Sequence, residues 1–355
     1  MRVAVVGGTG FLGRHVVTEL ARSFPGCRLD LCCAARTSPV FPLPGTFVQG
    51  DRADPSLIRE LMGFRPDIWI DLALFEPEEM ESLVAAWDMG GRAVRSVVVA
   101  GSIAEYGLSR RHLLPVTEEC PLDAEGPYGR GKADAWRAGL EAFQSRRFPL
   151  AWAVLPQLWG QGDPHNRDAS WIAQVVKGEP ILLRGNGRTL LPDGFVETAA
   201  AALVHLARAP GACGQRVNVA GPCCITPLSY LRWAAAELGR PLRVLHASPQ
   251  QMAEAERATG SMFRAPFGDY DFALDLRRLE GLGFSAPCTA EVGVRRTAAW
   301  HAGPAHAAAV RKVRDQEQHV GPLVPSAPPQ DSERCRAERN LRAALTRSSE
   351  RLHAL

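Results

Sequence analysis

The sequence predicts an α/β fold built on a doubly wound parallel sheet. Short apolar runs alternate with amphipathic stretches through the first half of the chain. A glycine-rich turn joins the first apolar run to the first amphipathic stretch. The composition, 46% hydrophobic and 22% charged over 355 residues, is ordinary for a globular protein and excludes a mainly disordered, collagen-like or coiled-coil chain.

The expected elements of the sheet domain follow in chain order. Residues 3–6 form a short buried strand, and residues 11–22 form a helix because Leu12, Val16 and Leu20 recur on one face. Further strands are expected at 29–35, 47–49, 68–73, 97–100 and 152–155. Helices are expected between most of them, at 55–64, 78–87 and 132–143. This β-α-β alternation favours parallel pairing of the strands.

The second half of the chain is less regular. Residues 160–195 read as loop-rich, and later elements are expected at 198–207, 216–219, 228–238, 275–279 and 289–300. We expect a sheet domain at 1–158, to which some later segments return, and a smaller substrate-binding lobe at 159–303. Residues 304–355 read as a tail that is either flexible or a partner-binding helix, because 320–334 is rich in Pro and Ser.

Charge and composition limit the classes of partner and site that we expect for this chain. The tail carries 9 of the 41 basic and 6 of the 38 acidic residues, which leaves 32 of each in the first 303 residues. A neutral body predicts no binding to nucleic acid. No apolar run approaches the roughly 18 residues of a membrane span, and the N-terminus lacks the features of a secretory signal, so we expect a cytoplasmic protein. No cysteine or histidine spacing indicates a metal site.

The strongest local motif is the glycine series Gly7, Gly10 and Gly13, which lies between the first strand and the first helix. The first glycine permits a tight turn, the second lets a pyrophosphate approach the backbone, and the third lets the helix pack on the strand. Free N–H groups at the start of the helix then bind the phosphates. The motif predicts a dinucleotide site, with a purely structural glycine turn as the alternative.

The end of the second strand selects the cofactor. An acidic residue there would bind the adenosine ribose and repel a 2′-phosphate, but this chain has Arg36, followed by two hydroxyl residues. A guanidinium can bind a 2′-phosphate through two parallel hydrogen bonds. We therefore expect NADP in preference to NAD, unless Arg36 is only a solvated loop charge or stacks on the adenine without selecting the phosphate. Asp51, after the third strand, is expected to bind the adenine amino group or to cap the next helix.

The catalytic candidates are Tyr128 and Lys132, which lie four residues apart on one helical face. The ammonium can lower the pKa of the phenol, which can then exchange a proton with a substrate oxygen while hydride moves. Ser102 ends the fifth strand, where it can donate to the same oxygen or cap the next turn. Tyr106, one turn later, is interpreted as structural or as adjacent to the substrate.

These motifs, in this order, resemble those of extended short-chain dehydrogenases/reductases of the NAD-dependent epimerase/dehydratase family. The resemblance covers about residues 1–300, and DLALFEPEEME at 71–81 is similar to its atypical branch. It implies a Rossmann-type fold in which Ser102, Tyr128 and Lys132 carry catalysis. It also implies a cofactor site lined by Gly7, Thr9, Gly10, Phe11, Leu12, Gly13, Arg36, Asp51, Arg52, Ala73, Lys132 and Pro156.

The substrate pocket departs from the family pattern. Gln157 stands where the family often has asparagine, Trp159 replaces a tyrosine, and Thr198 begins a segment that lacks the usual acidic pair. Arg264 lies where sugar-nucleotide enzymes often keep an arginine for the diphosphate, although it also reads as a surface arginine. Ile103 and Ala104 follow the serine where a dehydratase usually has an acidic pair.

The resulting expectation is an NAD(P)-dependent epimerase or ketoreductase that acts on a polar substrate, with a sugar or nucleotide sugar as the leading class. The alternative is a non-catalytic nucleotide- or RNA-binding homologue from the atypical branch. A homodimer is expected by resemblance alone.

Overall fold

The computed structural model describes residues 1–24, 29–39, 41–107, 112–164, 168–248, 250–251 and 270–303. The chain divides into two compact units. The first unit consists of Met1–Trp159, Pro192–Cys224 and Phe272–Ala290, and the second consists of Gly160–Leu191, Ile225–Asp271 and Glu291–Leu355. The first unit therefore takes two late segments from the range 159–303, and the tail from 304 lies outside the described residues.

A seven-stranded parallel sheet forms the first unit, in the order β3-β2-β1-β4-β5-β6-β9. The strands are β1 (Arg2–Val6), β2 (Asp30–Ala35), β3 (Thr46–Gln49), β4 (Ile68–Asp71), β5 (Ser96–Ser102), β6 (Leu150–Leu155) and β9 (Arg216–Asn218). The order reverses at β1, which pairs with β2 on one side and β4 on the other. Such a reversal opens a ligand crevice at the carboxyl ends of the strands.

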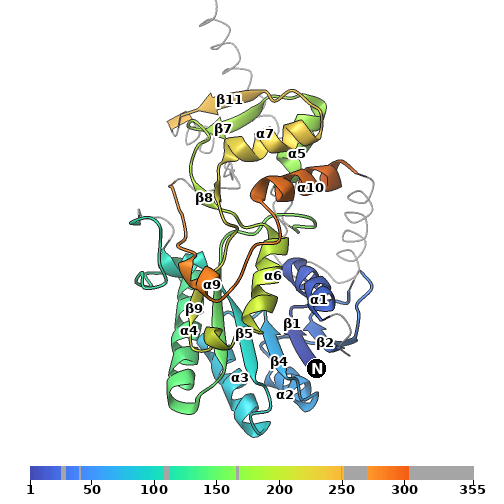
Figure 1. Cartoon of the computed structure of the whole chain (residues 1–355), viewed down its shortest axis with the longest axis vertical. Helices are drawn as coiled ribbons and strands as arrows, with labels where there is room; N and C mark the ends of the chain where they lie inside the picture. Colours follow the sequence, from blue (N-terminus) through green and yellow to red (C-terminus); the bar gives the residue numbers. More distant parts are fainter. Residues whose placement is uncertain are drawn as a thin grey trace, which may run out of the picture. The chain divides into compact units, whose positions relative to one another are not determined.

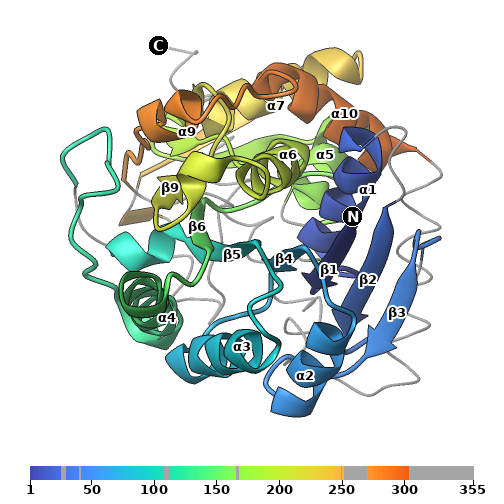
Figure 2. The ribbon, with the colours of Figure 1, turned by 60° about the horizontal axis from the view of Figure 1, so that its bottom comes forward.

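Helices cover both faces of the sheet, as Figure 2 shows. One face carries α2 (Pro55–Gly63), α3 (Pro77–Met89) and α4 (Gly126–Arg146). The other carries α1 (Phe11–Ser23) and α6 (Val196–Leu206). Central strands such as β6 are therefore buried on both sides and read as continuous apolar runs, which is typical of parallel sheets, whereas the edge strand β3 is exposed or half-buried.

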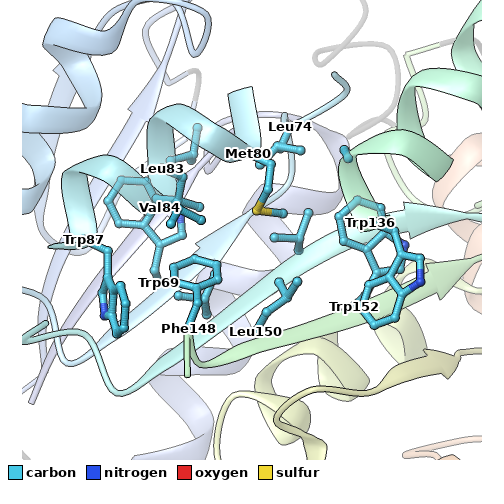
Figure 3. Close-up of a cluster of buried hydrophobic side chains, with 14 of the residues drawn as sticks. Trp69, Leu74, Met80, Leu83, Val84, Trp87, Trp136, Phe148, Leu150 and Trp152 are labelled. Carbon is cyan, nitrogen blue, oxygen red and sulfur yellow. The ribbon is translucent and has the colours of Figure 1, made fainter. Parts of the chain in front are cut away.

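The core under α3 and α4 is rich in large aromatic side chains (Figure 3). Trp69 and Trp152 are both fully buried, and Trp87 packs edge-on against Phe148 with 5.2 Å between ring centroids. The core under α1 and α6 uses small and branched residues instead, such as Ala199 of α6. Each fully buried large side chain contributes about 1.5–3 kcal/mol through removal of apolar surface from water.

The remaining elements of the first unit are short: two 3₁₀ helices, η1 (Ile103–Tyr106) and η2 (Pro210–Ala212), and α9 (Arg277–Gly281). Two other elements lie across the boundaries between the units, β8 (Leu191–Pro192) and β10 (Cys224–Ile225). No helix in the described part of the chain is long and apolar enough to cross a membrane.

The second unit contains α5 (Ala169–Lys177), β7 (Ile181–Arg184), α7 (Pro227–Glu237), β11 (Val244–Ala247) and nearly all of α10 (Ala290–Ala302) (Figure 1). Strands β7 and β11 pair in parallel. At its centre the Tyr230 hydroxyl donates to Asp168 at 2.7 Å, and both side chains are buried.

The fold class predicted from the sequence is confirmed, and the strands of the sheet lie within two residues of their expected bounds. The start expected for one helix is wrong: α4 begins at Gly126, six residues before the expected helix. This start was obscured by glycine, because α4 carries Gly126, Gly129 and Gly131 in its first turns. The loop-rich segment 160–195 also contains α5 and β7.

Candidate active site

The turn between β1 and α1 requires glycine at two positions. Gly7 has a φ of +80°, and its carbonyl accepts from the Gly10 N–H at 3.0 Å. A Cβ on Gly13 would lie only 2.1 Å from that carbonyl oxygen. The helix therefore packs on the turn in a way that a side chain at Gly13 would prevent.

The N-terminus of α1 fits an anionic group. Gly10 is the N-cap residue, no side chain caps the helix, and the first turn, which starts with Phe11 and Leu12, contains no acidic residue. The uncapped N–H groups and the helix dipole favour negative charge at this point. The turn can thus hold the pyrophosphate of a dinucleotide.

Arg36 lies after β2, close to the glycine turn. The Thr9 hydroxyl donates to the Thr37 carbonyl at 3.1 Å and so ties the turn to this segment. The Gln49 side-chain amide donates to the Arg36 carbonyl at 3.1 Å. The Arg36 side chain itself is exposed, so it is accessible to a phosphate group.

The loop after β3 differs in detail from expectation. Asp51 is exposed and accepts from the Ala53 N–H at 3.0 Å, but the cap of α2 is Asp54, which accepts from the Ser56 N–H at 2.8 Å. The alternative role of Asp51 as that helix cap is therefore wrong. The Arg52 side chain is buried and pairs with Asp71 at 2.7 Å, so only its backbone is available to a ligand.

The carboxyl end of β4 borders the glycine turn. A Cβ on Gly7 would lie 3.3 Å from the Leu72 Cβ and 3.6 Å from the Ala73 Cβ. The Ala73 N–H donates to Asp71 at 3.1 Å, which fixes the chain as it leaves the strand. The small side chain of Ala73 leaves room beside the turn.

Ser102 lies where β5 passes into η1 and forms a capping box with Glu105. The Ser102 hydroxyl oxygen accepts from the Ala104 N–H at 3.2 Å, and the Ser102 N–H donates to Glu105 at 2.7 Å. Both expected roles are compatible, because the cap uses the oxygen as an acceptor and leaves the hydroxyl proton for a substrate oxygen.

Tyr128 and Lys132 lie on the first turns of α4, and two glycines let this helix approach its neighbours. A Cβ on Gly129 would lie 2.6 Å from the Ala104 carbonyl oxygen, and one on Gly131 would lie 2.6 Å from a Glu76 carboxylate oxygen. Tyr128 is half exposed. Desolvation raises the pKa of its phenol, and hydrogen bonding with the Ser102 hydroxyl opposes that rise.

Lys132 is fully buried beside this pair. Its Nζ donates to the carbonyls of Leu74 and Ala100, the latter at 2.6 Å. It also lies 4.5 Å from the centroid of the Phe75 ring, which is a cation–π distance. Burial lowers the pKa of Lys132 to about 8, and the carboxylate of Glu105 is the largest influence in the opposite direction.

The residues that were expected near the substrate differ in their exposure. Tyr106 is 0% exposed and donates to Asn218 at 2.7 Å, which favours the structural one of its two expected roles. Pro156 is buried directly after β6, and Gln157 is exposed. Arg264 lies outside the described residues.

Two residues of the site were missed by the sequence analysis. Phe75 is 40% exposed and its ring centroid lies 6.0 Å from that of Tyr128, beside Lys132. Glu105 is 0% exposed and contacts Ser102. Phe75 could have been noticed as a large aromatic residue shortly after an expected strand. The burial of Glu105 depends on packing that the sequence alone does not reveal.

Two curated enzymes are similar in sequence to part of this chain. The UDP-glucose 4-epimerase of Lactobacillus helveticus is 29% identical over 220 residues, which cover 55% of this chain and 64% of that enzyme. The dTDP-6-deoxy-L-talose 4-dehydrogenase (NAD(P)(+)) of Kitasatospora kifunensis is 26% identical over 270 residues, 68% of this chain and 81% of that enzyme. The chain thus spans less than two thirds of the Lactobacillus relative.

Solved structures share the fold. The dTDP-glucose 4,6-dehydratase of Bacillus anthracis, in complex with NAD, has a TM-score of 0.69 at 16% identity and covers 85% of this chain and 96% of its own. The Thermotoga maritima UDP-glucose 4-epimerase with UDP-glucose has a TM-score of 0.68 at 17% identity and covers 88% and 100%.

The family profile gives the decisive match. The NAD dependent epimerase/dehydratase family matches residues 3–220, a range that contains the glycine turn, Ser102, Tyr128 and Lys132. Because this range is more than half of the 355 residues, the chain belongs to the NAD dependent epimerase/dehydratase family.

Proposed function

We propose that this protein is an NAD(P)-dependent enzyme that oxidises a hydroxyl-bearing carbon, or reduces a ketone, on a nucleotide sugar. The observation that carries the proposal is the grouping of the Ser102 and Tyr128 hydroxyls beside the buried ammonium of Lys132. Relatives named for UDP-glucose and for a dTDP-deoxysugar support the substrate class.

The roles follow from the chemistry of the three side chains. Ser102 donates a hydrogen bond to the substrate oxygen, and Tyr128 gives or takes the proton of that oxygen. Lys132, held in its protonated form, lowers the pKa of the phenol. When bound, the cofactor supplies or accepts the hydride. The backbone of the glycine turn would hold its pyrophosphate, and Ala73 would border it.

We propose NADP as the preferred cofactor, on the basis of the exposed Arg36 beside the glycine turn. The hydrophobic residues Ile103 and Ala104 after Ser102 disfavour dehydration, which needs a second acid and base near the substrate. Epimerisation and ketone reduction are the two outcomes that remain. A preference for NADP favours reduction, because an epimerase regenerates its own cofactor.

The test begins with the nucleotide that co-purifies with the full chain, identified by mass spectrometry after denaturation. The chain is then incubated with UDP- and dTDP-hexoses and their 4-keto derivatives, with and without NADPH or NADH. Cofactor-dependent conversion of any of these sugars supports the proposal. Binding of neither dinucleotide at millimolar concentration, together with no conversion, would refute it.

We also propose a homodimer, which the family resemblance favours. Light scattering on the purified full chain measures the assembly directly. A monomer across the micromolar range contradicts this part of the proposal and leaves the chemistry unaffected.

A further inference from the structure

Glu105 is a buried carboxylate at the centre of the candidate site. It is 0% exposed, and its oxygens accept from the Ser102 N–H at 2.7 Å and from the Trp152 indole N–H at 2.9 and 3.2 Å. Both donors are neutral. Burial raises the pKa of Glu105, while these hydrogen bonds and the positive charges of Arg216 and Lys132 oppose that rise and favour the carboxylate.

The missing side chain of Gly101 makes the space for this carboxylate. A Cβ on Gly101 would lie 2.7 Å from a Glu105 oxygen and 2.1 Å from the Trp152 indole nitrogen. The glycine next to the end of β5, the indole of β6 and the carboxylate of η1 therefore form one fitted arrangement. Such fitting is typical of a group with a defined position.

Lys132 lies near the same indole. Its Nζ is 6.0 Å from the centroid of the Trp152 ring and donates to the Ala100 carbonyl at 2.6 Å. The ammonium thus binds the residue before Gly101, and the carboxylate binds the residue after it. Both charged side chains are therefore bound to the end of β5 that carries the serine.

Other charged groups also act on the pair. Asp71 of β4, which pairs with Arg52 at 2.7 Å, and Glu79 of α3, which accepts from the Phe75 N–H at 2.6 Å, raise the pKa of Lys132 less than Glu105 does. Arg216 of β9 donates to the backbone of Glu118 and Cys120, keeps its charge, and lowers the pKa of Glu105 more than Lys132 does. Arg52 is itself a like charge that disfavours protonation of Lys132.

We propose that Glu105 is a positioning residue for the reaction: its carboxylate holds the backbone of Ser102 and supplies the buried negative charge that keeps Lys132 protonated. The inference rests on the proposed function, in which a charged Lys132 lowers the pKa of the Tyr128 phenol. It adds a residue that acts through the serine and the lysine without touching the substrate.

The chain offers a direct measurement, because it contains three lysines, Lys132, Lys177 and Lys312. Their side-chain signals in a ¹³C-lysine-labelled sample can be titrated by NMR, with Lys132 assigned from a Lys132→Arg sample. Glu105→Gln preserves the shape and removes the charge. Glu118→Gln is the matched control, because Glu118 is also buried and accepts from a backbone N–H, that of Asn218 at 2.9 Å.

We expect Glu105→Gln to lower the pKa of Lys132 by about one unit or more, which is the usual effect of losing a close opposite charge. The alkaline limb of the turnover–pH profile should also move down, because the charge of Glu105 raises the pKa of the Tyr128 phenol as well. Glu118→Gln should leave both unchanged. An unaltered Lys132 titration in Glu105→Gln, or an equal shift in Glu118→Gln, would overturn the inference.

Glu105→Asp separates the two roles and serves where the Gln variant does not fold. It keeps the charge but shortens the reach to Ser102, so turnover should fall while the Lys132 titration stays near that of the wild type. A shifted titration with unchanged turnover overturns the assignment. The NMR titration needs no substrate. If Glu105→Gln shifts the Lys132 titration but the wild type shows no turnover, the proposed function is rejected and the charge coupling stands.

Discussion

Gly129 packs directly on the backbone of Ala104, where a Cβ would lie 2.6 Å from the carbonyl oxygen. Glycine inside a helix costs about 1 kcal/mol relative to alanine, so its presence in α4 requires a compensating reason. Here the reason is the close approach of α4 to η1. That approach brings Tyr128 of one element to Ser102, the N-cap of the other.

Gly129→Ala should therefore destabilise the protein by about 1–3 kcal/mol, the range for overpacking a tight contact, and should also lower turnover by moving the phenol. Urea unfolding followed by circular dichroism measures the first effect. The control is Gly63→Ala at the end of α2, where a Cβ meets nothing within 4 Å. Alanine there should be neutral or stabilising, and equal losses in both variants would contradict this account.

Tyr128→Phe should reduce turnover by at least about 10²-fold while cofactor binding is retained, because only the proton donor is removed. The phenol is half exposed and its ring stacks near Phe75, so phenylalanine preserves the packing. Turnover on the best nucleotide sugar and dinucleotide affinity by fluorescence quenching are measured together. Turnover equal to that of the wild type would remove Tyr128 from the mechanism.

Arg36→Ala should weaken NADPH binding by about tenfold or more and leave NADH binding nearly unchanged, because a charge-assisted hydrogen bond to the 2′-phosphate is worth about 1.5–3 kcal/mol. Arg95→Ala is the control: this arginine is 77% exposed, pairs with Asp67, and precedes the amino end of β5, whereas Arg36 follows the carboxyl end of β2. Titration of each variant with both cofactors decides the point. A similar loss for both cofactors in Arg36→Ala would exclude phosphate recognition.

The central strands of the sheet could be predicted because each is a largely apolar run between turn signals. Val3 to Val6 are all buried, and so is the whole of β6. Burial on both faces of a parallel sheet produces this pattern directly. The glycine turn could be predicted equally well, since Gly7 needs a positive φ and Gly13 makes a close contact that excludes a side chain.

The electrostatics of the site could not be predicted in this way. Nothing in the run Ser-Ile-Ala-Glu-Tyr-Gly shows that Glu105 is buried, because its partner Trp152 lies 47 residues away on a neighbouring strand. Arg52 was expected at the cofactor, but Asp71, 19 residues further on, holds its side chain. Side-chain partners set by tertiary packing are the part that local pattern leaves open.

Asp193 provides a prediction for the dependence of stability on pH. Its side chain is 1% exposed; one oxygen accepts from the Phe195 N–H at 3.1 Å and the other has no hydrogen-bond partner. A Cβ on Gly221 would lie 1.9 Å from that second oxygen, so the backbone of Gly221 covers it. Burial raises the pKa of Asp193 to about 6.

The sign of the effect follows from proton binding. Between about pH 4, where an unfolded aspartate titrates, and pH 6, the folded chain binds the proton and the unfolded chain does not, so stability falls as the pH rises. The cost at pH 7 is at most about 3 kcal/mol. Asp193→Asn keeps the acceptor for Phe195 and cannot ionise. It should therefore equal the wild type near pH 4 and exceed it increasingly up to pH 6, as measured by urea unfolding.

Asp275 should show the opposite behaviour, which makes Asp275→Asn the matched control. Its carboxylate binds the Arg277 guanidinium at 2.7 Å, and hydrogen bonding to Arg277 lowers its pKa. Its contribution is present at neutral pH and is lost as the pH falls through its folded pKa. Asp275→Asn should thus be less stable than the wild type at pH 7, by a small amount because Arg277 is 82% exposed, and the difference should vanish in acid. If Asp193→Asn is also less stable at pH 7, Asp193 is held as a favourable charge, and the cost assigned to ionising its buried carboxyl group is wrong.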